Sequence, residues 1–210
     1  MVELGARRVP LARWRQADAL SLPFDDRQFD LVVCQFGVMF FPDRPAAFRE
    51  MRRMLAPGGR LLFSTWGPID THGFGAALVA GLTKAFPHDP PDFLARVPHG
   101  YCDLRQIAAD LAEAGLEYTP AVSVMLDGHA DSAAGVAAGF CSGTPLRSAI
   151  EARGDLPACT AVIADEMTAR LGTGPVTATM TAYIIDLRIH AHEKAAVARL
   201  EGKPSGRDDA

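Results

Sequence analysis

The strongest constraint on the fold is the run FDLVVCQF at residues 29–36, in which apolar residues do not alternate with polar ones. A strand with one face in water alternates, whereas a continuous apolar run is typical of a strand that helices cover on both faces. We therefore expect a buried strand of a parallel sheet here, within an α/β domain.

The segment that follows this run predicts a helix and then a second strand. Asp43 can cap a helix over residues 44–55, whose apolar residues recur on one face. The sequence APGG would end that helix, with Gly58 or Gly59 in the left-handed conformation. The residues RLLFSTW at 60–66 predict the next strand. Strands that alternate with helices indicate an α/β fold with a largely parallel sheet.

The remaining elements complete one domain over residues 1–198, followed by a polar tail at 199–210 that we expect to be disordered. Two irregular or helical segments, 67–99 and 130–171, would form a partly helical lid. In chain order the other expected elements are a helix over 1–8, a strand over 11–17 that ends at Asp18, helices over 75–86 and 103–115, an edge strand over 116–126 and a last strand over 177–191.

Composition narrows the classes of partner. The sequence is 49% hydrophobic and 22% charged, with a net charge of −4 at pH 7. Binding to a phosphate backbone needs a basic surface, so a nucleic-acid partner is not expected. No apolar run approaches the roughly 18 residues that a membrane span requires, and the N-terminal residues lack the apolar core of a signal peptide. We expect a cytoplasmic protein that does not act at a membrane.

No pattern predicts a metal site or a disulfide framework. The four cysteines are widely spaced and include no C-x-x-C pair. His190 and His192 lie two residues apart, but no third ligand accompanies them, and we interpret them as surface histidines.

Three quoted segments together carry a family resemblance. The sequences DALSLPFDDRQFDLVV, REMRRML and PGGRLLFSTW, in this order between Leu11 and Trp66, resemble the class I S-adenosylmethionine-dependent methyltransferases of the small-molecule branch. The resemblance implies a Rossmann-like sheet, S-adenosylmethionine as cofactor and a small-molecule methyl acceptor. Beyond Trp66 only the order of elements matches.

The resemblance also implies a set of site residues. Ligands of open α/β sheets bind outside the carboxyl ends of the strands. Asp18 would accept a hydrogen bond from the adenine amino group, which suits a carboxylate, and the backbone of Ala19 and Leu20 would complete the adenine edge. Gln35 and Phe36 would contact the methionine end of the cofactor.

Residues for the substrate are less specific. We expect Met39, Trp66, His72 and Phe74 to line the substrate pocket. His72, His88 and His99 lie in the lid region, and one of them could act as a general base. Because proximity and alignment alone can suffice for methyl transfer, no catalytic residue is assigned.

The sequence departs from the family at its N-terminal end. It contains no glycine-rich turn of the type D/E-x-G-x-G-x-G, and residues 1–8 look like the helix after the family's second strand. We therefore expect a sheet that lacks its first two strands, which leaves FDLVVCQF with an exposed apolar edge and lowers cofactor affinity. We favour Met1 as an internal methionine of a longer enzyme over a true truncation.

Other functions were weighed against methyl transfer. The chain could be an inactive methyltransferase-like module that uses its exposed edge to form a homo-oligomer or to bind a partner. Another nucleotide-binding protein, such as a dehydrogenase, is a weaker alternative because its glycine fingerprint is also missing. Neither a G-x-S-x-G elbow nor a P-loop occurs.

Overall fold

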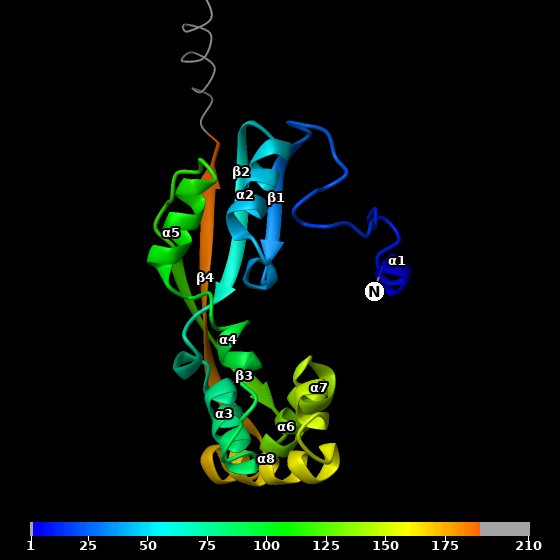
Figure 1. Cartoon of the computed structure of the whole chain (residues 1–210), viewed down its shortest axis with the longest axis vertical. Coiled ribbons are helices and arrows are strands. Elements are labelled where there is room, and N and C mark those ends of the chain that lie inside the picture. Colours follow the sequence, from blue (N-terminus) through cyan, green and yellow to red (C-terminus); the bar gives the residue numbers. More distant parts are fainter. Residues whose placement is uncertain (1, 190–210) are drawn as a thin grey trace, which may run out of the picture.

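A computed structural model describes residues 2–189, which form a four-stranded mixed sheet with helices grouped in two places (Figure 1). In chain order the elements are α1 (Val2–Arg8), β1 (Phe29–Gln35), η1 (Val38–Phe40), α2 (Arg44–Met54), β2 (Leu55–Trp66), η2 (Ile69–Thr71), α3 (Gly73–Ala85), α4 (Phe93–Arg96), α5 (Leu104–Glu113), β3 (Val122–Ala130), α6 (Ala133–Gly143), α7 (Leu146–Glu151), α8 (Leu156–Leu171) and β4 (Val176–Arg188).

The strand order is β1-β2-β4-β3. β1 and β2 are parallel, but β4 runs antiparallel to both of its neighbours. The prediction of a largely parallel sheet was therefore wrong for these strands. The reason is that β4 returns from the helices α6 to α8 and enters the sheet between β2 and β3 in the reverse direction. The predicted edge position of β3 is confirmed.

The first hydrophobic core, which we call the sheet core, lies between the sheet and the helices α2 and α5. Phe48 of α2 packs against Phe63 of β2, with ring centroids 5.2 Å apart. The predicted cap of α2 is confirmed, since the Asp43 carboxylate accepts a hydrogen bond from the Ala46 N–H at 2.8 Å. The helix ends at Met54, earlier than predicted, and Gly58, with φ +82°, lies within β2 instead of at the helix end.

The second core, which we call the lid core, lies among α3, α6, α7 and α8 and the distal parts of β3 and β4, at the lower end of Figure 1. The predicted helices in this lid are confirmed. A Cβ atom on Gly81 of α3 would lie 2.9 Å from the Ile163 side chain of α8, so the glycine lets the two helices approach closely. Within residues 2–189 no helix is long and apolar enough to cross a membrane.

β1 forms one edge of the sheet, as expected, and its outward face is not buried. Leu31 and Val33 are 49% and 56% exposed, whereas Val32 and Cys34 pack toward the sheet core. The prediction that both faces of this strand are covered was therefore wrong for the described residues. Alternate residues of a strand point to opposite faces, so covering one face leaves every second apolar residue in contact with water.

The segment before β1 is not a strand. The predicted strand over 11–17 was wrong, and only an isolated bridge between Asp18 and Ser21 forms in this region. Among the described residues no neighbouring strand is available to pair with it, because there β1 pairs only with β2. The predicted helix α1 is confirmed; it buries no residue and stands away from the sheet (Figure 1). The predicted tail at 199–210, and His190 and His192, lie outside the described residues.

Candidate functional site

The two cores meet at the carboxyl ends of β1 and β2. β1 ends at Gln35 and β2 ends at Trp66, and the chain then leads through η2 into the lid helix α3. The carboxyl ends of parallel strands are where ligands bind in open α/β sheets. We call the cluster of Phe36, Trp66, His72 and His99 at this place the junction.

Two of the junction residues, Phe36 and Trp66, have stacked aromatic rings. The rings of Phe36 and Trp66 lie 4.0 Å apart between centroids and are nearly parallel, at 15°. Phe36 has φ +49°, a left-handed conformation that is uncommon for a non-glycine residue. Its backbone N–H donates to the Ser64 hydroxyl at 3.1 Å. Backbone strain of this kind concentrates at functional sites, where the surroundings hold it in place.

Two buried histidines lie next to Trp66. The ring centroids of His72 and His99 are 5.5 Å and 6.1 Å from that of Trp66, and 5.2 Å from each other. The two residues are only 6% and 5% exposed. They come from opposite ends of the segment between β2 and α5, so only the folded lid brings them together.

Backbone hydrogen bonds give the two imidazoles opposite tautomers. His72 caps α3, because its Nδ1 accepts a hydrogen bond from the Gly75 N–H at 3.0 Å. In His99 the Nδ1 lies 2.8 Å from the Gly67 carbonyl oxygen. A carbonyl oxygen can only accept, so Nδ1 of His99 carries the hydrogen. Neutral His72 therefore carries its hydrogen on Nε2, and neutral His99 has a bare Nε2.

Both imidazoles favour the neutral form. Burial lowers the pKa of His72, and the neighbouring His99 lowers it further. Burial also lowers the pKa of His99, against a smaller opposing effect of its hydrogen bond to Gly67. Each ring is thus available at neutral pH as an uncharged donor and acceptor.

The role of His72 as a cap can be tested by a pair of substitutions. His72→Ala should lower the free energy of unfolding at pH 7.5 by about 1 kcal/mol, within the usual range for a lost N-cap. His72→Asn should keep the cap, because an asparagine side-chain oxygen can accept from Gly75. Urea unfolding of the three proteins measures this difference, and equal losses in both variants would contradict the assigned role.

The lowered pKa values also predict how stability depends on pH. Both histidines bind protons more readily in the unfolded chain, whose ordinary pKa is 6.5, than in the folded one. The contribution of these two histidines to stability should therefore be fully present above that pH and fall as the pH decreases below it. The double variant His72→Asn/His99→Asn should show a shallower fall in urea titrations between pH 7.5 and pH 5, and an unchanged slope would contradict the prediction.

Some residues predicted for the substrate lie at the junction and others do not. Trp66 and His72 belong to it. Met39 is buried in the sheet core and Phe74 in the lid core, so these two side chains pack on opposite sides of the junction. The sequence does not distinguish His99 from His72 and His88, because its distance along the chain from Trp66 gives no sign that the two rings meet.

The residues predicted for the cofactor lie on exposed segments. Asp18 is exposed and its Oδ1 accepts from the Leu20 N–H at 2.9 Å, which forms a local turn. Ala19 lies within that turn. Gln35 is exposed at the end of β1, and Phe36 lies in the junction. No strand ends at Asp18, so this position rests on the turn and not on the sheet edge that the sequence suggested.

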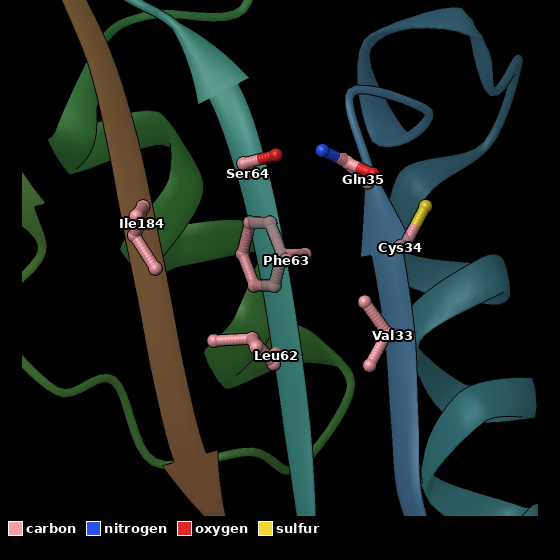
Figure 2. A pocket seen from close by; sticks show the side chains of 7 residues that line it. All are labelled: Val33, Cys34, Gln35, Leu62, Phe63, Ser64 and Ile184. Carbon is pink, nitrogen blue, oxygen red and sulfur yellow. The ribbon is translucent and has the colours of Figure 1, made fainter. Parts of the chain in front are cut away.

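A shallow cavity of about 270 Å³ is lined by residues of β1, β2 and β4, including Gln35 at the carboxyl end of β1 (Figure 2). Ser64 lies two residues before Trp66, so both point to the same face of β2. The cavity is mostly apolar, with the Gln35 amide and the Ser64 hydroxyl at its upper end in the figure. Its lining residues are Val33, Cys34, Gln35, Leu62, Phe63, Ser64 and Ile184.

Comparison with known sequences points to one enzyme class. A family model described as a methyltransferase domain matches residues 1–63, from α1 into β2. Demethylmenaquinone methyltransferases are similar: that of Deinococcus radiodurans is 36% identical over 105 residues, 43% of each chain, and that of Beutenbergia cavernae is 37% identical over 124 residues, 55% of this chain and 52% of the relative. The chain thus spans about half the length of the curated relatives it matches.

Solved structures show the same fold. The YcgJ protein of Bacillus subtilis superposes with a TM-score of 0.55 and 21% identity, over 90% of this chain and 78% of that one. A Bacillus halodurans protein assigned as a methyltransferase superposes with a TM-score of 0.50 and 14% identity, over 89% and 86% of the two chains. At these identities the likeness establishes a Rossmann-like methyltransferase fold and nothing finer.

Proposed function

We propose that this chain, which is similar to methyltransferases in sequence and in fold, is a class I S-adenosylmethionine-dependent methyltransferase that takes part in methyl transfer to a small apolar molecule bound at the junction. The observation that carries this proposal is the placement of Phe36, Trp66 and two neutral histidines at the carboxyl ends of β1 and β2, between the sheet core and the second, helical core.

The residues present suit one wall of a cofactor site. Asp18 uses Oδ1 for its own turn, which leaves Oδ2 as an acceptor for an exocyclic amine. Gln35 presents an exposed amide at the end of β1. When bound, S-adenosylmethionine would supply the electrophilic methyl group. The part of this chain is to hold the adenine edge through Asp18 to Leu20 and to place the acceptor against the junction.

The ends of β1 and β2 favour an acceptor that carries an apolar ring. The Phe36–Trp66 stack and the apolar cavity offer flat and hydrophobic contacts, with few polar groups to fix orientation. Relatives are named for methylating demethylmenaquinone, so a naphthoquinol is a reasonable first acceptor for this chain. The helices α6 to α8 lie outside the matched family segment.

The test of this proposal is a calorimetric titration with S-adenosylhomocysteine. We expect the 210-residue chain to bind it and Asp18→Asn to weaken the affinity about 10-fold or more, the usual cost of a lost hydrogen bond to a charged group. The asparagine keeps an oxygen for the Leu20 turn, so the loss would not come from the loop. Asp25→Asn, an exposed carboxylate in the same segment, should leave the affinity unchanged.

Two results would reject this function for the chain. One is a folded protein that does not bind S-adenosylhomocysteine up to millimolar concentrations. The other is equal binding by the wild type, Asp18→Asn and Asp25→Asn, because binding would then not use the predicted adenine edge.

A second function is favoured by the exposed side of β1. Leu31 and Val33 are half-exposed on a strand with one open edge, which is a template for pairing with another chain. Under this alternative the protein is a partner or oligomerisation subunit. Sedimentation equilibrium of the titration sample decides between them: a defined dimer that does not bind S-adenosylhomocysteine supports the module, and a monomer that binds it supports the enzyme.

A further inference from the structure

The junction holds a proton donor and a proton acceptor side by side. Each imidazole uses Nδ1 for a backbone hydrogen bond, and neither Nε2 atom makes a hydrogen bond within residues 2–189. His72 presents an N–H at Nε2, whereas His99 presents a lone pair. The rings are perpendicular, at 88°, so they do not stack.

The two histidines differ in what protonation would cost. His72 could take a second proton only at Nδ1, which would break its hydrogen bond to Gly75 and uncap α3. His99 would take it at Nε2 and keep its bond to Gly67. Among the charged or titratable side chains of the described residues, only His99 affects the pKa of His72, and none affects that of His99; no carboxylate contributes to either ring. Of the two histidines, only His99 can therefore accept a proton without losing its backbone hydrogen bond.

We propose that Nε2 of His99 is the proton acceptor for an acidic hydroxyl group on a ring-bearing ligand at the junction, with the His72 Nε2–H donating to the same ligand. This inference rests on the proposed function, for which it names the residue that would activate the acceptor. The hydroxyl O–H bond breaks, its electron pair stays on oxygen, and the proton moves to Nε2 to give an imidazolium. That proton passes to water when the ligand leaves.

The position of His99 beside Trp66 also indicates which ligands would bind at the junction. The Trp66 ring lies beside both imidazoles, and Ser64, which lines the apolar cavity, lies two residues before Trp66 on the same face of β2. A ring held against Trp66 would bring a hydroxyl substituent to the histidine edges. A ligand with the same ring but no acidic proton would lose the contact with His99 and keep the stacking.

The experiment is long-range ¹H–¹⁵N NMR of histidine-labelled protein, titrated with 1-naphthol and, in parallel, with 1-methoxynaphthalene. We expect free His99 to show a hydrogen on Nδ1 and a bare Nε2, and His72 the reverse. 1-Naphthol should shift the His99 Nε2 resonance toward the protonated position, and 1-methoxynaphthalene should not. The opposite tautomer in His99, no response to 1-naphthol, or equal responses to both probes would overturn the inference.

Variants separate proton acceptance from packing. His99→Asn can still donate a side-chain N–H to Gly67 but lacks the basic nitrogen. It should weaken 1-naphthol binding about 10-fold and leave 1-methoxynaphthalene binding unchanged. His88→Gln, at an exposed lid histidine, should affect neither probe. A His99→Asn protein that binds both probes like the wild type would also overturn the inference.

The NMR titration of His99 and the calorimetric titration with S-adenosylhomocysteine can succeed or fail separately. If S-adenosylhomocysteine does not bind but His99 responds to 1-naphthol, the proposed function fails and the proton-acceptor site stands. If S-adenosylhomocysteine binds and His99 does not respond, the enzyme assignment stands and the role of His99 is rejected.

Discussion

Replacing Phe63 by alanine is expected to lower the free energy of unfolding by about 3–5 kcal/mol, the usual cost of truncating a buried phenylalanine. Phe63 is 1% exposed at the centre of the sheet core. Its ring packs against Phe48 of α2, so the substitution removes apolar burial, an aromatic contact and part of the anchor of α2 together. Because small domains are stable by only about 5–15 kcal/mol, the loss would be a large part of the total.

Chemical denaturation followed by circular dichroism measures this effect. Leu62→Ala is the matched control, because Leu62 directly precedes Phe63 in β2 and points to the half-exposed face of the sheet. It should cost clearly less than Phe63→Ala. Equal losses at the two positions would mean that the face bearing Leu62 is as deeply buried as the sheet core, contrary to the described structure.

Replacing Ile163 by alanine is expected to cost about 2–5 kcal/mol in the lid. Ile163 of α8 is completely buried, and it fills the position where α3 passes closest, at Gly81. The lid core and the sheet core are separate clusters of buried residues. We therefore expect the loss to fall first on α3, α6 and α8.

Amide hydrogen exchange distinguishes a local loss from a global one. In Ile163→Ala, amides of the lid helices should exchange faster while those of β1 and β2 keep their protection. Val162→Ala, the preceding and 38% exposed residue of the same helix, should change neither set. Equal loss of protection in the lid and in the parallel strands would show that the two cores unfold as one unit.

The individual elements followed from local pattern. Asp43 and the spacing of Phe48 and Met51 predicted α2 with its cap, and the apolar run ending at Gln35 predicted β1. These predictions succeeded because the helical period, the N-cap and strand propensity act over a few residues. The family resemblance between Leu11 and Trp66 is likewise local, and the matched family segment confirms it.

Local sequence patterns did not predict which strands pair or which side chains are exposed to solvent. The strand expected at 11–17 does not form, because a strand needs a neighbour and among the described residues β1 pairs only with β2. The apolar run of β1 looked doubly covered, but which residues are covered depends on what packs on each face. The reversed direction of β4 follows from the path of the lid, which no short stretch of sequence encodes.

The same distinction between local pattern and tertiary structure applies to the candidate site. Sequence alone determined that an acidic turn, an apolar strand end and a histidine-bearing lid belong to one methyltransferase-like chain. Only the tertiary structure decided that His72 and His99 meet beside Trp66, and that Met39 and Phe74 are buried in two different cores. Ring contacts and tautomers depend on backbone groups such as Gly67 and Gly75 being placed in space, and a linear pattern of side chains does not specify that placement.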